Sequence, residues 1–557
     1  MDAFLWDMEG ASQYACSGRD LLHPPVGMCG DTVVTNVPSA ESLSLDAHER
    51  VRYEQFDRLQ RQLAGVWKSM RTDAEGESVV VVPSVTLDRI NERGGTLTQA
   101  YEERFLFMLL LLRQPRLRMV YVTSMPIAPA IIEYYLALLP GVIPSHARAR
   151  LSLVSVDDAS AKPLSEKLLA RPRLLKQIRA LVPDRARSHL VPYNTTGMER
   201  DLALALGIPM YGADPRLVGL GTKTGCRRLF AQEGIRHPLG VEDVHTMDEV
   251  ADAIVRMRSE RATLSSVIVK LDEGVSGEGN SLVDVSDLPD HGTRSEREVV
   301  GRRLRSLQFE LPDISHQDYV DKLAQRGGVV EERITGVELR SPSVQLHVTP
   351  LGEVEVLSTH DQLLGGPSGQ SYLGCRFPAD LAYARQISED AAIIGARLAR
   401  EGVLGRFAID FVVVKEPSGT WIPFAIEINL RKGGTTHPFL TLQFLTDGSY
   451  DARAGVFKTK VGDEKCLVAT DHLESALLRG LRLNDLFDVI VRHGLHFDQT
   501  QQTGVVFHMI SCVTEHGRIG LTAVGNTPDE AEVMYRRAER ALLEEAQQAL
   551  DDVVATP

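Results

Sequence analysis

The chain has 557 residues, which is too long for a single hydrophobic core and predicts two to four domains. Its 61 basic and 75 acidic residues give a formal net charge of −14, which argues against general binding to nucleic acid or to anionic membranes, although it allows a local basic cleft. The longest uncharged apolar block, within Phe105–Leu112, is far too short to span a bilayer.

The first residues and the cysteines indicate in which cellular compartment the protein is expected. Residues 1–9 contain neither a basic n-region nor a long apolar segment, so no secretory signal is expected. The six cysteines are scattered and form no Cys-x-x-Cys pair, which is typical of reduced thiols and not of a disulfide framework or a zinc site. We therefore expect a cytoplasmic protein.

The N-terminal third predicts an α/β layer after a loose start. Residues 1–45 are rich in Gly, Ser, Pro and Asp without periodicity, so we expect a disordered extension, with a docking or leader-like segment as the alternative. An amphipathic helix is expected over 47–70. Strands are expected at 78–83, 119–123, 151–156 and 189–193, and helices at 101–112 and 128–138. This alternation predicts an open and parallel sheet.

The middle of the chain mixes helices and strands. A helix is expected to start near Leu217, and a longer one over 381–400, where Ile387, Ala391, Ile394 and Leu398 form one apolar stripe. Strands are expected at 267–270, 329–334, 344–347 and 354–357. The last hundred residues predict the order α-α-β-β-α, and Thr527-Pro-Asp-Glu530 is a strong start for the last helix.

Two lysines stand beside glycines in this middle region. The strand ending at Lys270 leads into Leu-Asp-Glu-Gly-Val-Ser-Gly-Glu-Gly-Asn280. Glycines let backbone N–H groups approach phosphate oxygens, and a lysine adds positive charge to the same anion, although such loops also occur as plain hairpins. The loop matches neither a Walker A motif nor a dinucleotide fingerprint. Lys223, in Gly-Thr-Lys-Thr-Gly225, would by itself be a surface lysine.

A third feature is the stretch Glu331-Glu-Arg-Ile-Thr-Gly-Val-Glu338. A strand that runs out through a turn can offer backbone N–H and C=O groups to an adenine edge, and Glu338 can accept hydrogen bonds from ribose hydroxyls. The alternative is an acidic bulge near the rim of a sheet.

The fourth feature is a strand pair that carries acidic and amide side chains. Residues 407–414 and 425–431 read as short strands joined by a turn at 415–420, so they should form a hairpin. Alternation places Glu427 and Asn429 on one face, and Asp410 can join them from the other strand. Two carboxylates about 4 Å apart repel by about 4 kcal/mol at an effective dielectric near 20. A bound Mg²⁺ would turn this repulsion into a net attraction, so the three side chains are predicted to bind Mg²⁺. The alternative interpretation is a solvated hairpin edge with scattered charge.

Taken in order, these features resemble the ATP-grasp superfamily over residues 198–450, and residues 119–209 resemble the domain that precedes it. The resemblance implies that Lys223 and Lys270 hold ATP phosphates and that Ser276, Gly277 and Gly279 belong to a mobile phosphate lid. It further implies that Glu331, Arg333 and Ile334 form the adenine hinge, that Glu338 holds the ribose, and that Asp410, Glu427 and Asn429 bind Mg²⁺, with Mn²⁺ as a substitute.

More narrowly, the chain resembles the peptide-ligase family of pheganomycin biosynthesis. The likeness is carried by 270–280, by Glu427-Ile-Asn-Leu-Arg-Lys-Gly-Gly-Thr-Thr-His-Pro438 and by Thr503-Gly-Val-Val-Phe-His-Met-Ile-Ser511. It implies a multidomain α/β and α+β fold. The expected division is an extension at 1–45, a pre-ATP-grasp domain at 46–215, an ATP-grasp domain of two subdomains at 216–455, and a small α+β domain at 456–557.

Three arginines are candidates for steadying the reacting groups. Better-known amino-acid ligases have an arginine two residues before the first metal acid, where this chain has Ala408. Arg406, four residues before Asp410, lies on the same face of the predicted strand as Asp410. Arg431 lies two residues beyond Asn429, so it is the first candidate, with a charge partnership with Glu427 as the alternative. Arg340 is a third candidate.

Several histidines, among them His437, His508 and His516, match no metal-ligand spacing and are expected to be structural. His360-Asp361-Gln362, a polar break after a β-rich run, is the best of them as part of a substrate pocket.

The resemblance implies an ATP-dependent ligase that joins an amino acid or other small carboxylate to an amine or peptide through an acyl phosphate. The alternatives are an acid–thiol ligase, an acyl-phosphate-forming kinase, and a non-catalytic ATP-binding regulatory module. No nucleic acid or membrane partner is expected, and a homodimer is compatible with the sequence.

Overall fold

The computed structural model describes residues 47–72, 76–86, 96–274, 279–307, 309, 315–366, 369 and 371–555. The predicted extension at 1–45 lies outside these residues. Within the described ranges, no helix combines the length and the apolar character that crossing a bilayer requires.

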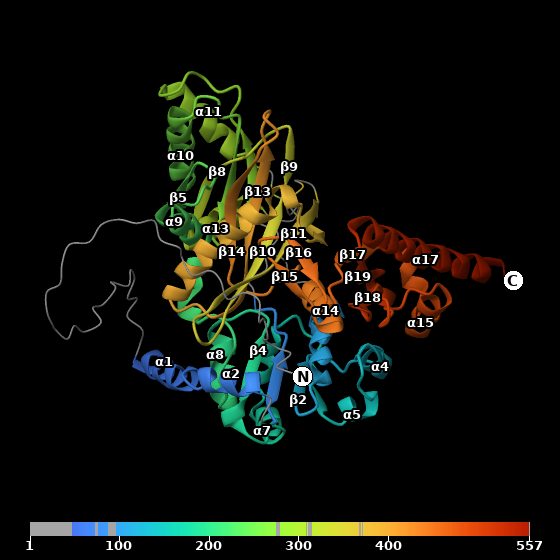
Figure 1. Cartoon of the computed structure of the whole chain (residues 1–557). Helices are drawn as coiled ribbons and strands as arrows, with labels where there is room; N and C mark the ends of the chain where they lie inside the picture. Colours follow the sequence, from blue (N-terminus) through green and yellow to red (C-terminus); the bar gives the residue numbers. More distant parts are fainter. Residues whose placement is uncertain are drawn as a thin grey trace, which may run out of the picture.

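The first region is a four-stranded parallel sheet in the order β3-β2-β1-β4, at the bottom of Figure 1. The parallel α/β layer predicted from the sequence is therefore confirmed. The expected helix over 47–70 is two helices, and the expected helix over 101–112 ends as a 3₁₀ helix, η1. The elements are α1 (Ala47–Gln60), α2 (Leu63–Thr72), β1 (Ser78–Val82), α3 (Thr96–Glu103), η1 (Arg104–Arg113), β2 (Arg118–Thr123), α4 (Pro129–Ala137), α5 (Pro144–Arg148), β3 (Leu151–Ser155), α6 (Leu164–Leu169), α7 (Pro172–Ala180), η2 (Arg185–Arg187), β4 (Ser188–Pro192) and α8 (Gly197–Leu206).

Both faces of this sheet are buried, as parallel sheets require. Along β1, Val79 and Val81 pack into a core with η1, whereas Val80 and Val82 pack into a core with α6, α7 and α8. The first core continues into the C-terminal strands through Leu467. The N-terminal layer is therefore joined to the far end of the chain by one continuous apolar cluster.

The next unit is a four-stranded antiparallel sheet in the order β5-β8-β6-β7, with α10 and α11 beside it at the top of Figure 1. Its strands include the ones expected at Lys270 and at Glu331. The elements are η3 (Pro215–Gly221), α9 (Lys223–Gln232), β5 (Gly240–Val244), α10 (Met247–Glu260), β6 (Ser266–Leu271), β7 (Asn280–Asp284), α11 (Arg294–Leu304), α12 (His316–Arg326) and β8 (Gly328–Glu332).

The largest sheet runs β14-β13-β10-β11-β12-β17-β19-β18, with β9 also paired to β13. Helix α13 covers it, and Ile387, Ala391, Ile394 and Leu398 are all buried, which confirms the predicted stripe. The elements up to residue 458 are β9 (Glu338–Arg340), β10 (Pro342–Val348), β11 (Val354–Gly365), β12 (Ser371–Phe377), α13 (Leu381–Arg400), β13 (Gly405–Lys415), β14 (Trp421–Asn429), α14 (Thr436–Thr446), β15 (Ser449–Asp451) and β16 (Val456–Lys458).

The C-terminal region extends this same sheet, at the right of Figure 1. The expected order α-α-β-β-α was wrong in omitting β17, whose interior Thr470-Asp471-His472 breaks the apolar pattern. The predicted start of the last helix is confirmed, because Glu530 N–H donates to Thr527 Oγ1 at 3.1 Å. The elements are β17 (Cys466–Glu474), η4 (Ala476–Gly480), α15 (Leu483–Arg492), β18 (Gly504–His508), α16 (Cys512–His516), β19 (Arg518–Gly525) and α17 (Pro528–Ala555). The predicted domain boundary at 455 remains a prediction, and the sheet continues across it.

Candidate functional site

The predicted hairpin forms, and it brings the metal-type side chains together. Strands β13 and β14 pair antiparallel, with Asp410 opposite Glu427 and Ala408 opposite Asn429. Ile409 and Ile428 point into the core and are at most 1% exposed. Because side chains alternate between the two faces of a strand, Asp410, Glu427 and Asn429 occupy the other face. Asn429 Nδ2 donates to Asp410 Oδ2 at 2.9 Å.

The electrostatics of this face suit a hard divalent cation. Burial, and then the negative charge of Glu427, raise the pKa of Asp410 to about 6, while Arg431 and hydrogen bonds from Ser343 and Gln362 act in the opposite direction. Two carboxylates and an amide oxygen are ligands of the kind that Mg²⁺ takes together with substrate phosphates. The donor set therefore fits the magnesium ion that the sequence predicts.

The two predicted lysines meet the hairpin from different elements. Lys223, at the start of α9, places its Nζ 3.4 Å from Glu427 Oε1. Its backbone N–H donates at 3.2 Å to the carbonyl of Asp272, which follows the strand of Lys270. Lys270 forms a buried ion pair with Glu331. The two lysine-bearing segments are thus held side by side, each lysine balanced by a carboxylate.

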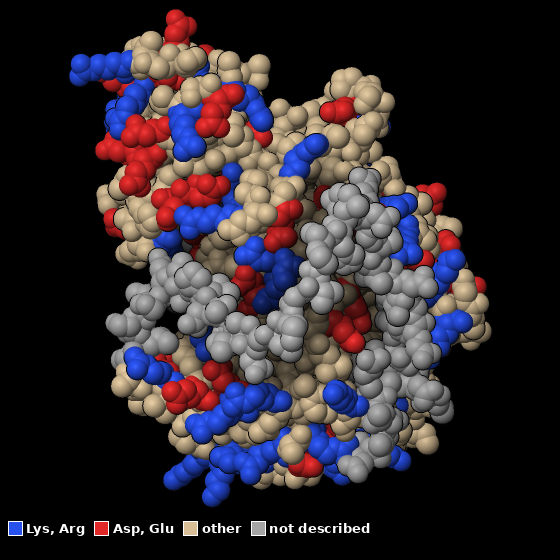
Figure 2. Space-filling model, turned by 60° about the vertical axis from the view of Figure 1, so that its left-hand side comes forward, with Lys and Arg blue, Asp and Glu red and all other residues tan. Residues whose placement is uncertain are grey.

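A pocket of about 260 Å³ opens beside this arrangement. On the face drawn in Figure 2, basic and acidic side chains lie next to one another in the hollow in the middle of the molecule. The pocket is lined by segments of the N-terminal layer, of the glycine loop and of β14, namely Thr86, Asn194–Thr196, Ala213–Pro215, Val218, Gly221, Thr222, Asp272–Gly274 and Glu427–Arg431. It therefore lies between the N-terminal layer and the predicted ATP-grasp region.

The three candidate arginines lie in different surroundings. Arg431 lines the pocket beside Glu427 and Asn429, and among the described residues it forms no ion pair with Glu427. Arg406 lines a separate cavity of about 30 Å³ with Tyr211 and Lys432. Arg340 lies on β9, where it pairs with Glu338 at 2.7 Å. Only Arg431 therefore lies at the predicted metal face.

The expected nucleotide-contacting residues are placed as follows. Arg333 and Ile334 begin the irregular connection after β8 that the hinge hypothesis requires. Glu331 itself is buried and contacts both Lys270 and Arg227, so its side chain stabilises the lysine. Glu338 pairs with Arg340 and Lys415.

The predicted phosphate lid is only partly described. Gly279 packs closely on Leu271, because a Cβ built there would lie 3.1 Å from the Leu271 side chain. Ser276 and Gly277 lie outside the described residues.

Two further residues of the site were not predicted individually. Gln362 Nε2 donates to Asp410 Oδ1 at 3.0 Å, so one residue of the polar break at His360-Asp361-Gln362 contacts the predicted metal face. Asp272 Oδ1 accepts from the Thr224 backbone N–H at 2.8 Å. No sequence pattern links Asp272 to the start of α9, because the two lie 48 residues apart.

Comparison with protein families supports this arrangement. The family described as IQCH-like, ATP-grasp matches residues 217–308 and 313–453, and the family described as PGM1 C-terminal domain matches residues 485–538.

Two known proteins are similar to this chain over most of its length. The L-propargylglycine–L-glutamate ligase of Streptantibioticus cattleyicolor is 29% identical over 484 residues, covering 85% of this chain and 95% of the ligase. The IQ motif-containing protein H of Danio rerio is 23% identical over 522 residues, covering 83% of this chain, and this chain spans about half (48%) of that protein.

Solved structures show the fold. The biotin carboxylase of Campylobacter jejuni, in a β,γ-ATP complex, matches with a TM-score of 0.50 at 11% identity, covering 85% of this chain and 95% of that one. The biotin carboxylase domain of the 2-oxoglutarate carboxylase of Hydrogenobacter thermophilus gives a TM-score of 0.50 at 13% identity, covering 83% and 89%. The resemblance predicted from the sequence is confirmed over residues 217–308 and 313–453, which match an ATP-grasp family model.

Proposed function

We propose that this protein is an ATP-dependent carboxylate–amine ligase that forms an amide bond through an acyl phosphate and releases ADP and phosphate. The observation that carries the proposal is the convergence of Asp410, Glu427 and Asn429 on one hairpin face, with Lys223 at 3.4 Å from Glu427, at the edge of a pocket. The similarity to a ligase named for two amino acids supports the reaction class.

In this proposal the chain's own residues chiefly position the reactants. Lys223 and Lys270 hold ATP phosphates, and Asp410, Glu427 and Asn429 hold the metal, Mg²⁺ with Mn²⁺ as a substitute. The metal, when bound, neutralises charge on the transferred phosphoryl group. The backbone at Arg333 and Ile334 receives the adenine, and Glu338 the ribose.

The chemistry needs little acid–base help at its first step. A substrate carboxylate is already ionised at neutral pH, and its oxygen attacks the γ-phosphorus while the bond to the β–γ bridging oxygen breaks and ADP leaves. An uncharged amine then attacks the acyl carbon and expels phosphate, losing its extra proton to solvent or to phosphate. Arg431, which lines the pocket at the metal face, is placed to steady the negatively charged acyl phosphate.

The substrate class rests on the similarity to the ligase named for two amino acids. The N-terminal wall of the pocket is polar: the Thr86 and Thr196 hydroxyls donate to Glu199, and the Asn194 side chain hydrogen-bonds to the Thr86 backbone. We therefore assign an amino acid or a related small carboxylate as the acid, and an amine or a peptide as the acceptor. A homodimer remains a prediction.

The test is a phosphate-release screen over pairs of amino acids, with mass spectrometry of the products. We expect ADP and phosphate release that requires both an acid and an amine, and a product whose mass is that of the two substrates less one water. Hydroxylamine should trap the acyl phosphate as a hydroxamate. Release that requires a thiol instead of an amine would assign the acid–thiol alternative, and ADP formation without any acceptor would assign the kinase.

A matched pair of variants on one hairpin tests the metal assignment. Glu427→Gln removes a carboxylate from the predicted metal face and should lower turnover by at least about 100-fold, as the loss of a main electrostatic contact does. Glu416→Gln changes the exposed turn of the same hairpin and should leave turnover unchanged. Equal turnover in the two variants would contradict the assignment.

A further inference from the structure

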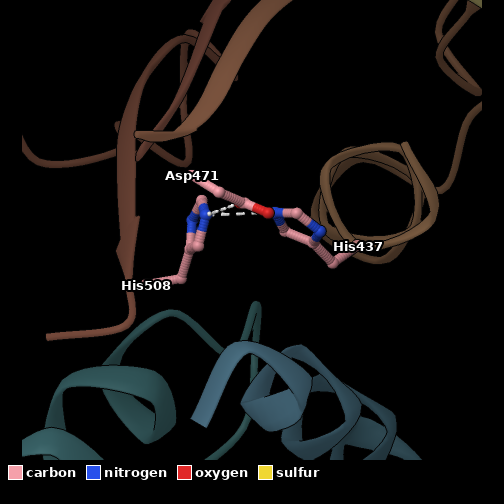
Figure 3. A group of neighbouring side chains, drawn as sticks. All are labelled: His437, Asp471 and His508. Carbon is pink, nitrogen blue, oxygen red and sulfur yellow. Dashed lines mark hydrogen bonds and ion pairs between the residues drawn. The ribbon is translucent and has the colours of Figure 1, made fainter. Parts of the chain in front are cut away.

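Three buried side chains from separate parts of the chain meet at one point, away from the pocket. His437 comes from α14, Asp471 from β17 and His508 from the end of β18 (Figure 3). His508 Nε2 lies 2.8 Å from Asp471 Oδ1, His437 Nε2 lies 3.2 Å from the same oxygen, and the two Nε2 atoms lie 3.0 Å apart. Their side chains are at most 4% exposed. None of the three lines the pocket at Glu427.

Protons alone do not satisfy this triangle of atoms. An imidazole nitrogen either carries a proton and donates or is bare and accepts, and an ionised carboxylate only accepts. If both Nε2 atoms are protonated and donate to Asp471, their own 3.0 Å contact is donor against donor. If only one is protonated, a bare nitrogen faces a carboxylate or a second lone pair. At least one of the three short contacts is therefore unfavourable in every protonation state that leaves Asp471 ionised.

A cation at the centre makes all three contacts favourable. Zn²⁺ binds imidazole nitrogen and carboxylate oxygen at about 2.0–2.2 Å, so in a tetrahedral site two such ligand atoms lie about 3.3 Å apart. The observed separations of 2.8, 3.0 and 3.2 Å are slightly below that value. A metal ion that enters this triangle therefore needs only small outward movements of the three side chains.

A buried arginine supports the carboxylate of this cluster. Arg104 contacts Oδ2 of Asp471 and leaves Oδ1 to the histidines. Arg104 therefore acts as an outer partner of the carboxylate, of the kind that orients metal ligands.

Space beside the cluster is kept by a glycine. Gly520 lies opposite His508 in the pairing of β18 with β19, and a Cβ built on it would come within 2.1 Å of His508 Nε2. Any other residue there would press on the atom that faces His437 and Asp471.

We propose that His437, Asp471 and His508 bind one divalent transition-metal ion of the zinc class, at a site distinct from the hairpin site for magnesium. Imidazole ligands suit Zn²⁺, Co²⁺ and Ni²⁺, whereas Mg²⁺ prefers oxygen ligands. The ion joins α14 to β17 and β18, and through Arg104 also to the N-terminal layer, so it stabilises the fold across three segments.

The test uses the full chain without nucleotide or substrates, so its result is independent of the ligase activity. Protein dialysed against EDTA is titrated with Co²⁺ in the presence of excess Mg²⁺, which keeps Co²⁺ from the hairpin site. We expect one equivalent of Co²⁺ per chain, visible absorption bands of a cobalt–imidazole complex, displacement by Zn²⁺, and a higher unfolding temperature with Zn²⁺. A folded wild-type protein that binds no stoichiometric Co²⁺ would overturn the proposal.

Two histidine variants locate the ion. His508→Gln should weaken Co²⁺ binding by at least about 100-fold, because a ligand is lost, and should abolish the rise in unfolding temperature with Zn²⁺. His493→Gln, which changes a histidine paired with Glu545 outside the cluster, should behave as the wild type does. Wild-type affinity in His508→Gln would also overturn the proposal. If His508→Gln does not fold, the wild-type titration decides by itself.

Discussion

Asp410, on the predicted metal face, shows how a single residue can lower the stability of the fold. Its carboxylate faces Glu427 across the hairpin, and burial and that charge raise its pKa to about 6. Neutral Asn at this position keeps the shape and removes the repulsion. Its NH2 group replaces one accepting oxygen, and a turn of the Gln362 or Asn429 amide restores that hydrogen bond. We therefore expect Asp410→Asn to raise the free energy of unfolding at pH 7 without metal by about 1–3 kcal/mol.

The same variant should lose its response to metal. In a thermal-shift experiment the wild type should gain stability from Mg²⁺ with ADP, while Asp410→Asn should gain much less. Glu416→Gln, in the exposed turn, serves as the control for both measurements. A variant that is less stable than the wild type in EDTA would contradict this account of the repulsion.

Lys432 gives the chain a pH dependence of a definite sign. Burial, and then the charge of Arg406, lower its pKa to about 7. Between about pH 7 and pH 10 the unfolded chain therefore binds more protons at this residue than the folded chain, so its contribution to the free energy of unfolding rises with pH. Lys432→Met removes the group, and its stability advantage over the wild type should shrink by roughly 2–4 kcal/mol from pH 7 to pH 10. Urea unfolding of both proteins at the two pH values measures this stability difference. A difference that is the same at pH 7 and pH 10 would contradict the prediction.

At the residue scale, sequence alone could predict what depends on neighbours along one strand or one hairpin. The shared face of Asp410, Glu427 and Asn429 follows from alternation and from one short turn. Gln362 required knowledge that β11 lies two strands away from β13 in the sheet, and no local pattern carries that order. The ion pair of Lys270 with Glu331 likewise depends on the pairing of β6 with β8.

At the scale of elements, α13 allows a direct test of its predicted apolar stripe. Ile394 is fully buried against the large sheet, whereas its neighbour Ile393 is 45% exposed. Ile394→Ala should lower the free energy of unfolding by about 2–5 kcal/mol, because it removes buried methylenes and leaves a cavity. Ile393→Ala should cost less than about 1 kcal/mol. Chemical denaturation of both variants gives the comparison, and equal losses would show that the stripe faces elsewhere.

Among the elements that were not predicted, β17 is the one whose interior is polar and buried. Strand β17 carries Thr470-Asp471-His472 where an apolar alternation would be expected, because Asp471 faces two histidines and Arg104 inside the molecule. At these positions polar residues that make buried contacts replace the apolar alternation by which a strand is recognised. Periodicity alone therefore does not identify a strand there.

At the scale of the whole molecule, the large sheet joins the ATP-grasp region to the C-terminal strands. Strand β12 pairs with β17 through residues 374–377 and 467–470, and Leu467 belongs to the same core as the N-terminal layer. A chain truncated after Lys458 would expose the edge of β12 and lose the part of that core that residues 467–546 contribute. We expect it to be insoluble or aggregated. A monomeric, cooperatively folding fragment by size exclusion and thermal unfolding would show instead that the predicted boundary near 455 separates independent units.

The ion pair between Lys223 and Glu427 has a consequence for the order of events. In the proposed function Lys223 binds the triphosphate and Glu427 binds the metal. In the structure the two side chains neutralise each other instead, with Lys223 Nζ 3.4 Å from Glu427 Oε1. A bare cation must displace an ammonium, and a bare triphosphate must approach two carboxylates. Binding of the metal to Glu427 frees Lys223 for the triphosphate, and binding of the triphosphate to Lys223 frees Glu427 for the metal. The two binding events are therefore positively coupled, and each ligand increases the affinity for the other by the same factor.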